Sequence, residues 1–265
     1  MITEWARLTT KEIEAIDKEN ALVVVPIGAT EQHGAHLPVG TDSLILGRLL
    51  EELANKVSFP DYKVLLTPLL PVGKSNEHMD FSGTLSFSTM TLYHMIDDLV
   101  KAIGSHGFGK ILLMNSHGGN TDLLNVLSRD LRIKHNVEVF VFDWWFTSFW
   151  KEILSQVQQS GNYGVFHACE LETSLMLYFC PELVDMSKAV DEFPDDQLTD
   201  NEHVSIKGPI VPGWKTQDVS LHGVIGAPTL ASAEKGRLFV EFAVQKLKEM
   251  LQEVIETNYT KLGSR

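Results

Sequence analysis

The amino-acid sequence predicts a layered α/β fold with a mostly parallel sheet. Three observations predict it: short runs of Val, Ile and Leu alternate with helical patterns, each run is apolar almost throughout, and polar clusters follow two of the runs. A strand that is covered on both faces has a nearly continuous apolar sequence. Right-handed crossovers between parallel strands place helices on both faces of the sheet.

Four apolar runs are predicted to be strands, at residues 22–27, 64–69, 111–114 and 137–142. Apolar residues repeat at helical spacing between and after these runs, which predicts helices over about residues 46–57, 92–103, 123–133, 168–179 and 232–254. Gly107 is read as the stop of the second helix and Ser232 as the N-cap of the last.

Residues 191–228 have no clear period and are rich in proline and acidic residues. This stretch is predicted to be a long loop that could cover a site. In parallel α/β folds, ligands bind at the carboxyl ends of the strands. We therefore expect the chemistry of the protein to lie at that edge of the sheet.

Length and composition restrict the class of protein. A chain of 265 residues fits a single domain over residues 1–265, and 44% hydrophobic residues can fill a sizeable core. The net charge of −13 and the lack of a basic stripe argue against nucleic acid as a partner. The polar N-terminal segment and the absence of a long apolar run predict a cytoplasmic location and no membrane contact. The two cysteines, Cys169 and Cys180, indicate neither a disulfide framework nor a thiolate zinc site.

The first predicted strand continues into PIGATEQHGAHLPVGTD, which holds Glu31, His33 and Asp42. Residues two apart in an extended segment face the same way, so Glu31 and His33 can converge on one point. Two carboxylates and an imidazole suit divalent zinc, manganese or iron. The alternative is a set of ordinary polar loop residues in which Asp42 caps the next helix.

The third predicted strand ends in NSHGGN, which repeats this arrangement. His117 follows the strand, and Gly118 and Gly119 allow a tight turn before the next helix. A glycine pair at such a junction can also bind phosphate, but neither GxGxxG nor GxxxxGK is present. Two strand ends in the same sheet that each deliver a possible ligand favour a metal site.

A third segment, HACELETS, opens the fourth predicted helix with His167, Glu170 and Glu172. Acidic residues in the first turn of a helix are stabilised by its dipole, which explains Glu170 well. Glu172 adjoins buried positions and could point inward as a ligand. The spacing alone leaves open which acid faces the site.

Two further groups carry weaker signals. The loop PVGKSNEHMDFSGTLSF could supply substrate hydrogen bonds through Ser75, Glu77 and His78, or be a polar turn. An aromatic group after the fourth strand could line a planar ligand, although packing is the favoured interpretation. That group consists of Trp144, Trp145, Phe146, Phe149 and Trp150.

Together these segments resemble the creatininase (creatinine amidohydrolase) family over nearly the whole chain. The motifs PIGATEQHGAHLPVGTD, PVGKSNEHMDFSGTLSF, NSHGGN, HACELETS and GVIGAPT stand in the family's order. The resemblance implies a three-layer α/β/α subunit, often assembled as a hexamer. It also implies a dinuclear metal centre that activates water to cleave a C–N amide bond.

Carried over to this chain, the resemblance makes Glu31 and His117 ligands of one metal ion and His33 a ligand of the other, with Asp42 between them. It makes Ser75 and His167 substrate contacts. His167 would also move a proton, and Glu170 is the alternative group for that step.

One departure from the family pattern concerns Gly118 and Gly119, where creatininase itself has Tyr-Glu. The carboxylate that completes its second metal site is therefore missing. The HGGN form is similar to members that act on formamides or mature small peptides, where the Glu of the HACELETS-type motif replaces it. In this chain that residue is Glu172.

We therefore expect an amidohydrolase of a small cyclic amide or formamide, with two divalent ions per subunit, zinc or manganese, with iron as an alternative. A deformylase of formamidopyrimidine-type compounds and a peptidase of small modified peptides share the same predicted centre. A catalytically silent ligand-binding homologue is the alternative from another class. The expected partners are a small-molecule substrate and further copies of this chain.

Overall fold

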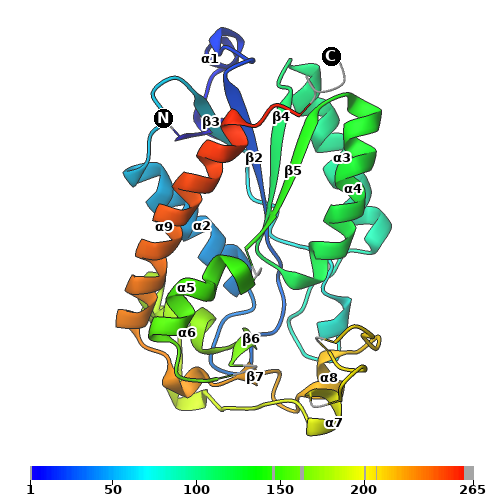
Figure 1. Ribbon diagram of the computed structural model, residues 1–265, viewed down its shortest axis with the longest axis vertical. Helices are drawn as coiled ribbons and strands as arrows, with labels where there is room; N and C mark the ends of the chain where they lie inside the picture. The colour runs from blue at the N-terminus through cyan, green and yellow to red at the C-terminus, as the bar shows by residue number, and fades with distance from the viewer. Residues whose placement is uncertain (1, 145–146, 162–163, 200, 207, 260–265) are drawn as a thin grey trace.

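A five-stranded parallel sheet forms the centre of the protein (Figure 1). The computed structural model describes residues 2–144, 147–161, 164–199, 201–206 and 208–259. The strand order is β1-β3-β2-β4-β5, and every pair is parallel. The strands are β1 (Ile2–Glu4), β2 (Ala21–Ile27), β3 (Lys63–Leu66), β4 (Lys110–Asn115) and β5 (Glu138–Asp143).

Helices cover both faces of this sheet, as Figure 1 shows for α2 and α9 on one side and α3 and α4 on the other. One layer contains α2 (Thr41–Lys56), α5 (Thr147–Val157), α6 (Glu170–Phe179) and α9 (Ala233–Glu256), and the other contains α3 (Thr89–Ser105) and α4 (Thr121–His135). Alternate residues of β2 enter the two cores: Leu22 and Val24 face the first, Val23 and Val25 the second. This explains the continuous apolar run and confirms the predicted three-layer α/β/α fold.

Most predicted boundaries lie within a few residues of those observed. Ser232 caps α9 by accepting a hydrogen bond from the Lys235 amide (3.2 Å), and Gly107 follows α3 with a φ of 90°. β3 is shorter than the strand predicted over residues 64–69. Pro68 has no N–H to donate to a ladder, so regular pairing ends at Leu66.

Several elements were not predicted from the sequence. They are α1 (Thr10–Ala15), α7 (Asp196–Thr199), α8 (Thr216–Val219), the antiparallel pair β6 (Val165–His167) and β7 (Ile225–Gly226), the edge strand β1 and the helix α5. Three of these elements, α7, α8 and β7, lie in the predicted loop 191–228. The loop also reaches the cavity described below, because Trp214 lines it.

The aromatic group after β5 mainly fills the core. Trp144 and Trp150 are fully buried and meet edge to face with centroids 5.0 Å apart. Trp145 and Phe146 lie outside the described residues. Among the helices that the structure describes, none has the length and hydropathy needed to cross a bilayer.

Candidate metal centre

Five candidate ligands meet at the carboxyl edge of the sheet. Glu31 and His33 follow β2, His117 follows β4, and Asp42 and Glu172 lie in the first turns of α2 and α6. All five side chains are buried. Residues separated by up to 141 positions therefore share one small volume, as the parallel topology predicts.

The five side chains form two overlapping groups of three. Glu31, Asp42 and His117 form one group, and His33, Asp42 and Glu172 form the other, with the ligand atoms of each group within 4.8 Å of one another. His117 Nδ1 lies 3.1 Å from Glu31 Oε2 and 3.7 Å from Asp42 Oδ2. His33 Nε2 lies 3.4 Å from Glu172 Oε1 and 3.7 Å from Asp42 Oδ1. The two Asp42 oxygens thus face different imidazoles.

Backbone carbonyls determine which imidazole nitrogens can bind a cation. His33 Nδ1 lies 3.1 Å from the Glu31 carbonyl oxygen, and His117 Nε2 lies 3.0 Å from that of Lys74. A carbonyl oxygen only accepts, so these nitrogens carry the hydrogen. In the neutral rings, His33 Nε2 and His117 Nδ1 then present lone pairs to the carboxylates, the orientation that metal-binding histidines adopt.

Unpartnered polar atoms show that the cluster fits a metal ion. Among the described residues, Glu31 Oε2, His33 Nε2 and Asp42 Oδ2 are buried and make no hydrogen bond. Lone pairs that face one another repel unless a proton or a cation lies between them. Donors about 2.0–2.1 Å from zinc lie about 3.3 Å apart in a tetrahedral site, close to the spacing observed here.

The buried carboxylates of the cluster also favour a bound cation, as the pKa shifts of the cluster indicate. Burial and the nearby Glu31 carboxylate raise the pKa of Asp42 to about 6. Burial opposes the ionisation of Glu31, but the imidazoles of His117 and His78 hold its pKa well below the usual value. Burial likewise opposes the charging of His33, yet Asp42 and Glu172 raise its pKa well above the usual value. Protons therefore hold the carboxylates together where a metal ion is absent.

The structure distinguishes the two acids of α6. Glu172 Oε2 accepts a hydrogen bond from the Cys169 amide (3.2 Å), which directs Oε1 toward His33. Glu170 points away from the cluster. Its carboxylate pairs with Lys235 and accepts hydrogen bonds from the Gln159 and Ser160 amides. Glu172 therefore joins the cluster and Glu170 does not.

The two predicted substrate contacts differ in position. His167 lines the cavity, with Nδ1 3.7 Å from Glu31 Oε1 and Nε2 2.8 Å from the Gln32 carbonyl oxygen. Burial and the nearby imidazoles of His33 and His78 hold the pKa of His167 well below its usual value. Ser75 is fully buried, and its Oγ lies 3.2 Å from His117 Nε2. Its position is beside the His117 ring and not on the cavity wall.

Two residues next to the cluster had weak or no signals in the sequence. His78 Nε2 lies 3.5 Å from Glu31 Oε1, and its Nδ1 lies 2.9 Å from Gln32 Nε2. The Gly34 amide orients the Gln32 side chain by donating a hydrogen bond to its Oε1 (2.9 Å). The position of Gln32 between Glu31 and His33 in the motif was the available signal.

Two asparagines of NSHGGN join the strand ends that carry the ligands. Asn120 Nδ2 donates to the Gly28 carbonyl (3.2 Å) and to Asn115 Oδ1 (3.1 Å), and its Oδ1 accepts from the Lys74 amide (2.8 Å). Asn115 Oδ1 also accepts from the His117 amide (3.2 Å). Both side chains are fully buried, so these bonds determine the relative positions of the ligand-bearing loops after β2 and β4 and of the loop that contains Lys74.

We expect Asn120→Ala to weaken metal binding although Asn120 is not a candidate ligand. The change leaves the Lys74 amide and the Gly28 carbonyl without partners, which costs about 1–3 kcal/mol of unfolding free energy for each. Metal affinity should fall about 10- to 100-fold, as for other groups that orient ligands. Metal titration and chemical denaturation measure the two effects. Asn125→Ala, on the exposed face of the same helix, is the control, and an unchanged metal affinity in Asn120→Ala would contradict the prediction.

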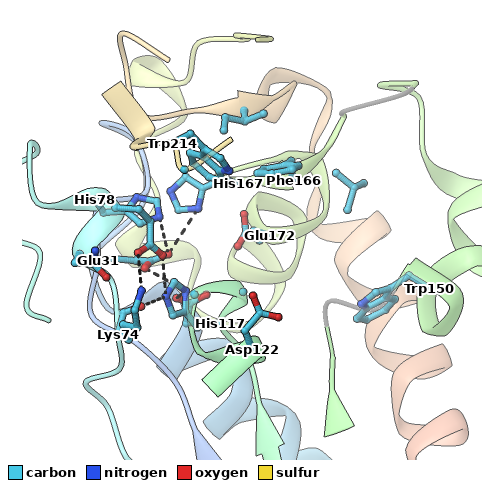
Figure 2. Close-up of a pocket in the computed structure, with 18 of the residues that line it drawn as sticks. Glu31, Lys74, His78, His117, Asp122, Trp150, Phe166, His167, Glu172 and Trp214 are labelled. Atoms are coloured by element: carbon cyan, nitrogen blue, oxygen red, sulfur yellow. Dashed lines mark hydrogen bonds and ion pairs between the residues drawn. The ribbon is translucent and has the colours of Figure 1, made fainter. Parts of the chain in front are cut away.

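The cluster opens into a cavity of about 730 Å³. Figure 2 shows Glu31, His78 and His117 at one side of it, with Trp150 at the opposite side and Phe166 and Trp214 along another wall. The buried carboxylates and imidazoles are thus reachable by a small molecule, which a purely structural ion site would not require.

The fold and this cluster define a metal-dependent amidohydrolase. The family model described as creatinine amidohydrolase matches residues 6–251, and the chain belongs to this family, the creatininases. It is 28% identical to the creatinine amidohydrolase of Pseudomonas putida over 93% of this chain and 95% of that protein.

Other relatives have other named activities. The chain is 26% identical to the 3-dehydro-scyllo-inosose hydrolase of Thermotoga maritima, over 94% of this chain and 82% of that enzyme. It is 30% identical to the mycofactocin precursor peptide peptidase of Mycobacterium ulcerans, over 83% and 80%.

Solved creatininase structures have the same fold. A manganese form matches with a TM-score of 0.75 and 25% identity over 96% of this chain and 99% of that one. A Glu-to-Gln mutant of the Zn-Zn type matches with a TM-score of 0.75 and 27% identity, over 96% and 98%. The relatives thus support divalent metal ions in this family.

Proposed function

We propose that the protein hydrolyses the C–N amide bond of a small molecule at a centre of two divalent ions. Glu31 and His117 would hold one ion, His33 and Glu172 the other, and Asp42 would lie between them. The sharing of Asp42 by two groups of ligand atoms is the observation that carries this proposal. Three carboxylates and two imidazoles suit zinc or manganese.

The bound ions would lower the pKa of water and polarise the amide carbonyl. The residues of the chain provide the rest of the chemistry. The carbonyl oxygens of Glu31 and Lys74 keep His33 and His117 in the tautomers that can bind a cation. The Cys169 amide keeps Glu172 directed at His33.

His167 is the group we assign to proton transfer. It lines the cavity beside Glu31, and burial favours its neutral form, which can accept a proton. Such a group transfers the proton to the leaving nitrogen of the amide and contributes about 100- to 10,000-fold to the rate. Glu170 is unsuited to this role because Lys235 and two backbone amides occupy its carboxylate.

The scissile amide is assigned only by class. The relatives include a creatinine amidohydrolase and a precursor peptide peptidase, so a cyclic amide, a formamide and a short peptide share the same proposed chemistry. Assembly into a homo-oligomer and a cytoplasmic location stay predictions. A catalytically silent binding protein is the contrasting possibility, which the experiment below tests.

Metal analysis combined with an activity panel tests the proposal. The purified protein, loaded separately with zinc, manganese and iron, is assayed with creatinine, formamidopyrimidine-type compounds and short peptides. We expect turnover of at least one class and a loss of about 1000-fold or more in Glu31→Gln and His117→Ala. Protein without bound metal, or variants with unchanged turnover, would refute the mechanism. Metal-loaded protein that turns over none of these amides would support the binding protein.

A further inference from the structure

The cavity beside the candidate ligands is larger than a single small ring requires. Its volume of about 730 Å³ lies in the range of roughly 300–1,000 Å³ that holds drug-sized ligands. The candidate ligands Glu31 and His117 lie at one side of it, opposite Trp150 (Figure 2). A substrate that reached only the metal ions would leave most of the cavity to water.

The free space begins directly beside His117. A Cβ atom added to Gly118 would meet no atom within 4 Å, although Gly118 adjoins a candidate ligand. A Cβ atom added to Gly119 would instead collide with His117 and Glu77. The first glycine of the pair therefore leaves room for a bound molecule, and the second allows close packing behind His117.

One part of the cavity is apolar. Leu154 of α5, Val165 and Phe166 of β6 and Trp214 of the segment before α8 line it, and all four side chains are half-buried. Phe166 and Trp214 pack with ring centroids 6.0 Å apart. Together with Trp150, these four residues form what we call the apolar arm. A ligand that covers half-buried apolar side chains gains free energy by displacing water.

Charge distinguishes the apolar arm from the rest of the cavity. Lys74, Glu77 and Asp122 line the side near His117. Apart from His167, the described residues that α5, β6 and the segment before α8 contribute to the lining carry no ionisable side chain. An ionised group placed there would lose its hydration without gaining a partner, so the arm favours an uncharged occupant.

We propose that the substrate is an amide that carries an uncharged apolar group, aromatic or branched aliphatic, which occupies the apolar arm while the amide lies at the metal centre. The proposal rests on the proposed function, because hydrolysis at the metal centre is what makes the occupant a substrate. It excludes compounds as small as creatinine as the best substrates of this protein.

Hydroxamic acids test the arm without knowledge of the substrate. The full-length protein, loaded with zinc or manganese, is titrated with acetohydroxamic acid and with 3-phenylpropionohydroxamic acid in a calorimeter. The two compounds share the metal-chelating group and differ in the apolar group. We expect the phenyl compound to bind at least about 10-fold more tightly. Equal dissociation constants would overturn the apolar arm, whereas failure of both compounds to bind would overturn the metal centre.

Variants on two separate elements locate the effect. In Trp214→Ala and in Leu154→Ala, the ratio of the two dissociation constants should fall toward one. Leu221→Ala is the matched control, because Leu221 belongs to the same region as Trp214, is 81% exposed and lies outside the large cavity. If one variant fails to fold, the other still tests whether the phenyl group binds in the apolar arm. Tight phenyl binding with an unchanged ratio in the folded variants would overturn the assignment to the arm.

Discussion

Asp42→Asn is expected to lower kcat by about 1000-fold or more, which corresponds to ~4 kcal/mol of transition-state stabilisation. Asn has the size of Asp but loses the charge and one of the two acceptor oxygens. Those oxygens face His33 and His117, which lie in different groups of candidate ligands. The variant should therefore bind fewer than two ions, as elemental analysis of dialysed protein would measure.

In the metal-free protein, the same substitution should increase thermal stability. The pKa of Asp42 is raised to about 6 from its usual value of 3.8, so the folded metal-free chain loses stability as the pH rises from about 4 to about 6. Metal-free Asp42→Asn should consequently melt higher than the metal-free parent at pH 8, and this difference should disappear below pH 4. Thermal melts at several pH values measure it.

Asp122→Asn is the control for both effects. Asp122 lines the same cavity but belongs to none of the groups of possible ligands found among the described residues. It should keep the full metal content. If Asp42→Asn also kept two ions, Asp42 would not lie between them.

The second large effect is expected for Gly119→Ala. The added methyl group would collide with Glu77 Oε1 and His117 Nε2 and lie 2.5 Å from the Lys74 carbonyl oxygen. His117 would have to move, and it would lose the hydrogen bond that orients its ring. We expect metal affinity to fall about 100-fold or more. Titration with zinc in competition with a chelator measures the change.

Gly118→Ala is the matched comparison, one residue earlier in the same turn. Its methyl group enters open space, so metal affinity should stay within about twofold of the parent. Similar losses in both variants would show that the turn itself, and not the contact with His117, determines affinity.

The fold was predictable where the sequence pattern is long and local. β2 and β4 are buried on both faces, and α9 carries its own cap at Ser232. β1 was not predictable, because three residues are too few to show a period, and it forms only by pairing with β3. The pair β6 and β7 joins segments about sixty residues apart, which no local pattern indicates.

The candidate site was likewise predictable only where its residues lie close together in the sequence. Glu31, His33 and Asp42 could be grouped because one short motif carries them directly after a buried strand. The choice between Glu170 and Glu172 could not be made, since it depends on Lys235 of a distant helix. The position of His78 beside the cluster could not be predicted either, because its neighbour Glu31 is 47 residues away in the sequence.

The elements that hold the candidate ligands differ from those that form the apolar arm. The ligands come from β2, β4, α2 and α6, whereas α5, β6 and the segment before α8 shape the arm. Apart from His167 of β6, substitutions in the second set are therefore expected to alter specificity without removing a candidate ligand. Descendants of one ancestral enzyme could thus acquire new substrates by changing one wall, in agreement with relatives whose names include a creatinine amidohydrolase, an inosose hydrolase and a peptide peptidase.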